Sequence, residues 1–349
     1  MPQNSSVSQS HPLIVQSHLR WDFVWQRPQQ LMMPYNFKVW AHPPKMLNKE
    51  WIGQRVSVVD IKKVLGNVIL DRDDAGWGPN ATFKYPRFGG TGGLFERMRP
   101  FVNDNLRTNA DVVGIDTEKK EVVTSDGTRE SYDELLSTMP IDILVSRMNG
   151  AVPDSIKDEA KRLRHSGSLI VGVGIRQPAP STRCWMYFPE DNCPFYRLTY
   201  LSNYSPEVVP DASTHYSILA EISRSDFKEE DADCIIEETI QGLINTKMIS
   251  QCDVQDIVDT HLIERDYTYP VPGLERDEAL GAIHPFLESH NIYSRGRFGA
   301  WRYEVGNMMK VPFPEWGVVL FAFSLGITCL GAAMEIALSI SYMLVQCCQ

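Results

Sequence analysis

Residues 184–206, CWMYFPEDNCPFYRLTYLSNYSP, gather the side chains that could hold a phosphorylated ligand. A single basic residue, Arg197, with Asn203 close behind it, stands among seven aromatic residues: Trp185, Tyr187, Phe188, Phe195, Tyr196, Tyr200 and Tyr204. Phenol hydroxyls and a guanidinium donate hydrogen bonds to phosphate oxygens, and the rings offer stacking faces for a base or a sugar. This composition favours a binding site over a core strand, although an aromatic-rich turn in a large protein would show it too.

The overall charge and the cysteine usage exclude several classes of function. A net charge of −10 over 349 residues argues against a nucleic-acid surface, which needs many Lys and Arg contacts, but it allows one local arginine site. Seven cysteines without a CxxC pair predict neither a disulfide framework nor a zinc site, and the histidines lack HExxH spacing, so no metal is expected. The N-terminus has no secretory signal, which makes the cytoplasm the expected location.

The periodicity of the chain predicts the elements that position these residues. Residues 111–140 indicate a meander of two strands joined by a charged turn, then a third strand, returning to a YDxLxxTMP strand. A helix is predicted from Ser155, and a buried strand from Ser168. Residues 214–223 alternate like a half-buried antiparallel strand, and a helix with one apolar face is predicted from Asp231. Tyr269 is expected in a proline-bounded loop.

Four more blocks carry a family resemblance: PYNFKVWA (34–41), WGPNATF (77–83), GGTGG (89–93) and SRGRFGAWRYEVGN (294–307). Together with the aromatic stretch they resemble eukaryotic, fungal-type UDP-galactopyranose mutase, from about residue 31 to residue 307. The resemblance implies a mixed α/β (α+β) fold, a truncated two-dinucleotide-binding-domain flavoprotein with an antiparallel substrate-side sheet and helices. It divides the chain into an atypical segment 1–30, a mutase-like region 31–307 and an atypical hydrophobic tail 308–349.

The resemblance also implies a reaction. Mutases of this family interconvert UDP-galactopyranose and UDP-galactofuranose for galactofuranose-containing cell-surface glycans. They use reduced FAD, whose N5 forms a covalent adduct with the sugar while UDP leaves and returns, and NAD(P)H is the expected reductant. The protein contributes by clamping the diphosphate and positioning the cleaved UDP.

Specific residues take roles by this resemblance. Arg55 and Arg197 are expected to be catalytic, at the diphosphate, and Arg297 and Asn307 to contact the flavin. The substrate-binding residues implied are Asn36, Trp40, Asn80, Trp185, Tyr187, Asn203, Tyr269 and Tyr303. From residue type alone, Trp40 and Tyr269 also suit core packing, and Arg55 also suits a surface charge.

The two ends of the chain depart from the family pattern. The first thirty residues contain no GxGxxG turn, the feature of a Rossmann unit that holds the flavin pyrophosphate, and the C-terminal segment of the family is missing after Asn307. GGTGG follows TFKYPRF rather than an apolar strand, so it does not replace that turn. Residues 318–345 approach the length of a membrane span but contain Glu335, and a buried helix or an altered tail would explain them equally.

Three classes of function therefore stay open. The first is a UDP-galactopyranose mutase with bound FAD, acting as a monomer or a homo-oligomer. The second is a catalytically inactive mutase fragment that binds UDP-sugar. The third is a flavin oxidoreductase of the amine-oxidase type, indicated by the meander, or a glycosyltransferase-like protein, indicated by SHLRWDFVWQRPQQL near the N-terminus.

Overall fold

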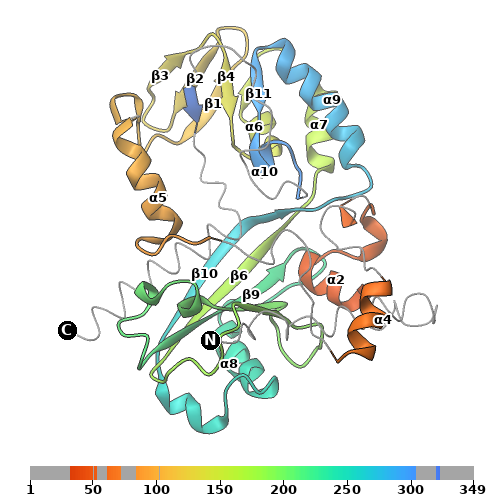
Figure 1. Cartoon of the computed structure of the whole chain (residues 1–349). Coiled ribbons are helices and arrows are strands. Elements are labelled where there is room, and N and C mark those ends of the chain that lie inside the picture. The colour runs from red at the N-terminus through yellow and green to blue at the C-terminus, as the bar shows by residue number, and fades with distance from the viewer. Residues whose placement is uncertain are drawn as a thin grey trace.

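The aromatic stretch lies in a five-stranded antiparallel sheet in the computed structural model of the chain (Figure 1). The strand order is β10 (Ile257–Pro270), β6 (His165–Ile175), β9 (Tyr216–Arg224), β8 (Arg197–Tyr200) and β7 (Trp185–Tyr187). The structure describes residues 32–49, 51–52, 61–71, 84–101, 103–303 and 320–322. The antiparallel sheet that the resemblance implied is thus confirmed.

Helices cover both faces of this sheet. On one face, α8 (Ile235–Asn245) packs over a core formed with the apolar positions of β9. On the other face lies α2 (Met32–Trp40), where the Ser223 hydroxyl donates a 2.6 Å hydrogen bond to the carbonyl oxygen of Lys38. Strand β9 is therefore buried along almost its whole length. The prediction of a half-buried strand is wrong, because polar positions such as Glu221 face a covered side rather than solvent.

A second lobe holds two smaller sheets. One has the order β3 (Arg129–Ser131), β2 (Glu121–Thr124), β1 (Val112–Asp116) and β5 (Met148–Asn149). The other is parallel, with the order β11 (Ile292–Ser294), β4 (Leu135–Ser137) and β12 (Leu320–Ala322). Helices α6 (Ile141–Ser146), α7 (Asp154–Arg162) and α9 (Arg276–Ser289) contribute buried residues to the core of this lobe.

Strands β6 and β10 run from the five-stranded sheet up to the second lobe (Figure 1). Their register breaks between Arg265 and Tyr269, close to that lobe. At the break, a Cβ built on Gly167 would lie 2.8 Å from the carbonyl oxygen of Arg265, so the close approach of the two backbones requires glycine there.

The remaining elements are short. Three are helices: α4 (Ile61–Ile69), α5 (Gly90–Met98) and α10 (Gly296–Gly299). Short 3-10 helices occupy Pro44–Met46, Arg99–Phe101, Asn103–Asn105, Leu201–Asn203, Pro206–Val208 and Gln251–Asp256. The GGTGG block forms the start of α5, with Gly89 at φ 70° and Gly90 at φ 55°, a left-handed conformation that suits glycine.

Most predictions of single elements are confirmed. The meander over residues 111–140 corresponds to β1, β2, β3 and β4. The helix predicted from Ser155 is α7, the strand predicted from Ser168 is β6, and the helix predicted from Asp231 is α8. The loop expected at Tyr269 is wrong, because β10 continues to Pro270 along β6.

The predictions for the two ends of the chain fall largely outside the described residues. Residues 1–30 and all of 308–349 except β12 are outside them, so the domain boundaries at 30 and 307 stay predictions. Within the apolar stretch 318–345, β12 pairs in parallel with β4. Among the helices that the structure describes, none has the length and apolar character needed to cross a membrane.

Candidate functional site

Four aromatic side chains meet beside α2 and form an aromatic cluster: Trp40, Trp51, Tyr269 and Tyr303. Trp40, the last residue of α2, is 1% exposed, and its ring centroid lies 4.7 Å from that of Tyr303, 5.3 Å from Trp51 and 5.8 Å from Tyr269. Edge-to-face pairs of this kind stabilise by about 0.5–1.5 kcal/mol each beyond area burial. The fold thus brings together three of the residues expected to bind substrate.

Arg297, in the short helix α10, extends the aromatic cluster. Its guanidinium carbon lies 5.9 Å from the ring centroid of Tyr269 and 5.8 Å from that of Tyr303, within cation–π range. Its Nε is buried and finds no hydrogen-bond partner among the described residues. Because a buried N–H without an acceptor costs free energy, this side chain has donor capacity available for a ligand.

Arg197 is held by a carboxylate that sequence reasoning missed. Strand β8 pairs with β9 so that Arg197 stands directly opposite Glu221, which is 1% exposed. The carboxylate accepts from Arg197 Nε and, at 2.6 Å, from Nη2, which is a bidentate pair. Burial opposes the charge, but Glu221 raises the pKa of Arg197 well above its usual value. The guanidinium stays charged and keeps Nη1 for another acceptor.

Two tyrosines lie next to this ion pair. The rings of Tyr35, on α2, and Tyr187, on β7, meet edge to face at 6.1 Å. Burial raises the pKa of Tyr35 well above its usual value, and Tyr187, Tyr303 and Glu221 raise it further, against the opposing charge of Arg197. Tyr35 therefore keeps its phenolic proton, and it links the aromatic cluster to Arg197.

A third group of aromatic residues is centred on Tyr204, which follows the 3-10 helix Leu201–Asn203. Trp185 and Tyr85 both make edge-to-face contacts with Tyr204, at 6.4 Å and 5.3 Å between ring centroids. Asn203 is committed to the fold: its Nδ2 donates to the carbonyl oxygens of Ser181 at 2.8 Å and Arg183 at 2.7 Å. Asn203 can therefore offer a ligand only its side-chain oxygen.

About half of the aromatic stretch is core rather than site. Phe188, Phe195 and Tyr200 pack in the core beneath α8. For Tyr200 the reason is the alternation of side chains in a strand, which places Leu198 and Tyr200 on the face opposite to Arg197. The interpretation of the whole stretch as a site is thus wrong for these residues.

Of the other predicted site residues, the structure describes only Asn36. Asn36 lies half-buried on α2. Arg55, Asn80 and Asn307 lie outside the described residues, so their roles stay predictions. Trp51 and Glu221 were not foreseen, since a tryptophan in EWIGQRV and an acid in ILAEIS carry no signal without their partners.

No family model matches the chain. A crystal structure of reduced UDP-galactopyranose mutase is similar over 83% of this chain and 63% of that chain, with 37% sequence identity and a TM-score of 0.76. The chain is a mutase-like protein.

The mutase-like chain spans less than two thirds of that enzyme's length. A proposed protoporphyrinogen oxidase from Exiguobacterium sp. 255-15 is also similar over 73% of this chain and 51% of that chain, at 15% identity and a TM-score of 0.48, which is too distant to inform the site. The family resemblance and the mixed α/β fold read from the sequence are confirmed by the mutase structure. In the part of the chain that the structure describes, no three His, Cys, Asp or Glu side chains form a metal-binding group.

Proposed function

We propose that this chain binds UDP-galactopyranose and UDP-galactofuranose and interconverts them with FAD. The observation that carries the proposal is the convergence of Arg197, Tyr35, Tyr187 and the aromatic cluster on one region beside α2. The similarity to UDP-galactopyranose mutase supports the choice of substrate. Supply of galactofuranose to cell-surface glycans, NAD(P)H as reductant and a cytoplasmic location belong to the same proposal.

Arg197 and the tyrosines would clamp the diphosphate. The Glu221 carboxylate binds Nε and Nη2 and so holds the guanidinium plane of Arg197 in one orientation. The remaining edge of the guanidinium would therefore be positioned in advance for an anion. Tyr35 stays protonated, because its pKa is raised by burial and by neighbouring groups, and can donate to a phosphate oxygen. Arg197 and Tyr35 would thus stabilise negative charge that develops on UDP as it leaves the sugar.

FAD would be held in part by Arg297. The buried Nε of Arg297, which has no acceptor among the described residues, suits the oxygen-rich edge of a flavin. Bound reduced FAD would supply the nucleophile of the reaction. The rings of Tyr269 and Tyr303 lie against the guanidinium and would help to hold it in one orientation.

Retention of flavin by the purified chain tests the proposed FAD-dependent mutase activity. The full chain is mixed with FAD, freed of excess cofactor by gel filtration and scanned for flavin absorbance. Retained and reducible flavin, followed by formation of UDP-galactofuranose, is the expected result. A chain without flavin would contradict the mutase proposal and leave a protein that binds UDP-sugar without catalysis.

UDP binding tests the site separately. Tyr303→Phe should weaken UDP binding by about tenfold, the value of one hydrogen bond to a charged group. Tyr132→Phe is the matched control, because Tyr132 is 5% exposed in the core of the second lobe and its hydroxyl has no partner among the described residues. Calorimetric titration showing equal affinities for both variants would remove Tyr303 from the site.

A further inference from the structure

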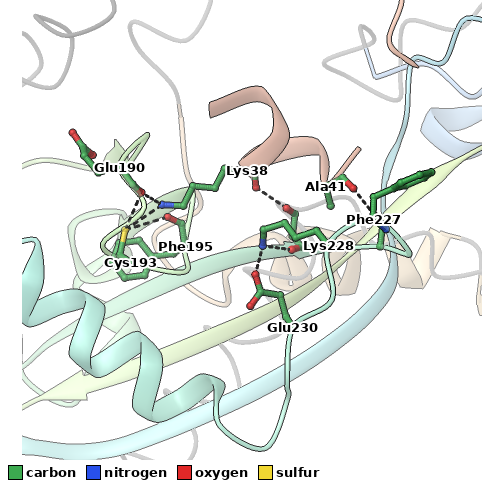
Figure 2. Close-up of polar contacts among 10 residues, drawn as sticks. Lys38, Ala41, Glu190, Cys193, Phe195, Phe227, Lys228 and Glu230 are labelled. Carbon is green, nitrogen blue, oxygen red and sulfur yellow. Dashed lines mark hydrogen bonds and ion pairs between the residues drawn. The ribbon is translucent and has the colours of Figure 1, made fainter. Parts of the chain in front are cut away.

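A lysine and a cysteine outside the proposed site meet beside α2 (Figure 2). Lys38 Nζ lies 3.3 Å from Cys193 Sγ, and the two residues are 8% and 5% exposed. The Lys38 ammonium also donates to the carbonyl oxygen of Glu190, and Cys193 Sγ lies 3.5 Å from the carbonyl oxygen of Phe195. These contacts hold the nitrogen and the sulfur in a fixed relative position.

Both side chains line a cavity. Its volume is about 570 Å³, and its walls also include Pro34 and Phe37 of α2 and Pro194 of the facing loop. One water occupies about 30 Å³ of liquid, so a small hydroperoxide can enter this space. The Lys38 and Cys193 side chains are thus largely buried and still reachable by a small oxidant.

We propose that Cys193 and Lys38 form a covalent sulfur–nitrogen bond when the chain is oxidised by a hydroperoxide. In the first step the Cys193 thiolate attacks the peroxide, the O–O bond breaks and a sulfenic acid forms, while the departing hydroxide (or alkoxide) takes up the proton that the thiol released and leaves as water (or alcohol). In the second step the neutral Lys38 amine attacks that sulfur, the S–O bond breaks, and the hydroxyl leaves as water with the amine proton. Sulfur loses two electrons and the peroxide gains them.

The pKa shifts of Lys38 and Cys193 favour attack by the Lys38 amine on the sulfenic acid, and they disfavour formation of the sulfenic acid. Burial lowers the pKa of Lys38, and the opposing effects of Cys193 and Glu190 do not restore it, so a neutral amine is more accessible than in an exposed lysine. Burial also raises the pKa of Cys193, with Glu190 and Asp191 adding to the effect and Lys38 opposing it. Sulfenic acid formation is therefore the slow step, and capture by the amine follows quickly.

The bond would connect two segments that build the candidate site. Lys38 lies on α2, between Tyr35 and Trp40, and Cys193 lies in the loop between β7 and β8 that leads to Arg197. Oxidation would fix α2 against this loop. The cross-link itself does not depend on the proposed mutase activity, so either can fail without the other.

Peptide mapping tests the proposal on the full chain. The protein is treated with hydrogen peroxide, alkylated, digested without a reductant and analysed by mass spectrometry. The expected product is a linked peptide pair containing Lys38 and Cys193, lighter by two hydrogens than the sum of its parts. Dithiothreitol should separate the pair, because a thiol reduces the sulfur–nitrogen bond.

Two variants and one internal reference sharpen the outcome. Lys38→Arg and Cys193→Ser should both abolish the linked pair, and Cys234, exposed beside Asp231, should oxidise without joining a lysine. Oxidation of Cys193 to sulfinic or sulfonic acid with Lys38 unmodified would overturn the proposal. A Cys193 thiol that survives after Cys234 is consumed would overturn it as well. The wild-type map decides the question even if a variant fails to fold.

Discussion

At the scale of single residues, the pairing of Arg197 with Glu221 decides both structure and chemistry. The carboxylate is almost fully buried, and the arginine side chain is 22% exposed. A buried pair is weak evidence for stability by itself, because desolvation offsets the attraction, but removing one partner leaves an uncompensated charge. Arg197 therefore has two roles. It is proposed to bind phosphate, and its positive charge offsets the free-energy cost of burying the Glu221 carboxylate in the sheet.

Arg197→Met should lower the free energy of unfolding by about 3–5 kcal/mol, because it strands the Glu221 carboxylate. The double variant Arg197→Met with Glu221→Leu should recover most of this loss while UDP binding stays lost. Urea midpoints of the two variants and the wild type measure the effect. Equal midpoints for wild type and Arg197→Met would show that the ion pair does not matter for stability.

Arg197 could be recognised from the sequence, whereas Glu221 could not. An arginine among phenols has a composition that indicates anion binding, but an acid in ILAEIS resembles a solvent-facing strand position. Only the register of β8 against β9 places the two together. Strand parity, which composition does not show, also explains why Tyr200 of the aromatic stretch belongs to the core: it points to the face opposite to Arg197.

At the scale of elements, α8 is fitted closely to the loop that carries Cys193. A Cβ built on Gly242 of α8 would lie 2.9 Å from Cys193 Cβ and 3.0 Å from Phe195 Cε1. By contrast, Gly281 of α9 is exposed and has nothing within 4 Å of the corresponding position. The same glycine-to-alanine substitution can therefore be made at a crowded helix position, Gly242, and at an open one, Gly281.

Gly242→Ala should destabilise the protein by about 1–3 kcal/mol through overpacking. Gly281→Ala should instead stabilise it by up to about 1 kcal/mol, since alanine loses less backbone entropy in a helix. Thermal or urea unfolding of the two variants gives the signs. The packing described between α8 and its loop would be incorrect if both variants shifted stability in the same direction.

Three histidines make the stability of the fold sensitive to acid. Burial is the largest cause that lowers the pKa values of His42, His165 and His284 below the ordinary 6.5. A lowered folded pKa means that stability is complete above the unfolded value and is lost as the pH falls through the folded value. Asp142 acts in the opposite direction, because burial raises its pKa.

The urea midpoint should therefore fall between about pH 7 and about pH 5, the range in which unperturbed histidine becomes protonated. His284→Asn should reduce this dependence, because it removes one of the three groups that must stay neutral in the folded state. Midpoints measured across the range for both proteins provide the comparison. A wild-type midpoint that does not change with pH would contradict the burial of these rings.

At the scale of the whole molecule, two helices present apolar faces. On α5 and its flanks, Leu94, Phe95 and Met98 are each about half exposed, and Phe101 is 87% exposed. On α4, Val68 and Ile69 are 72% and 77% exposed. Contiguous exposed apolar surface of this kind favours contact with another protein surface.

Self-association should accordingly rise with protein concentration, and Leu94→Lys combined with Phe101→Lys should reduce it. Leu274→Lys is the control, because Leu274 is 61% exposed but lies in the turn after β10, where its backbone N–H donates to the carbonyl oxygen of Met46. Sedimentation velocity at several concentrations measures the effect. If the double variant and the control associate alike, the α5 face is not the contact.

The pairing of β6 with β10 determines how cooperatively the two lobes unfold. The inner strand of this ladder, β6, is buried along nearly its whole length in the lower sheet, and its upper end reaches the core of the second lobe, where Tyr267 of β10 packs. Neither lobe can lose its core without releasing the strands that it shares with the other. Amide hydrogens of β6 should therefore exchange with solvent at the same slow rate as those of α9. Cleavage of the ladder at one point would unfold both lobes in a single cooperative event.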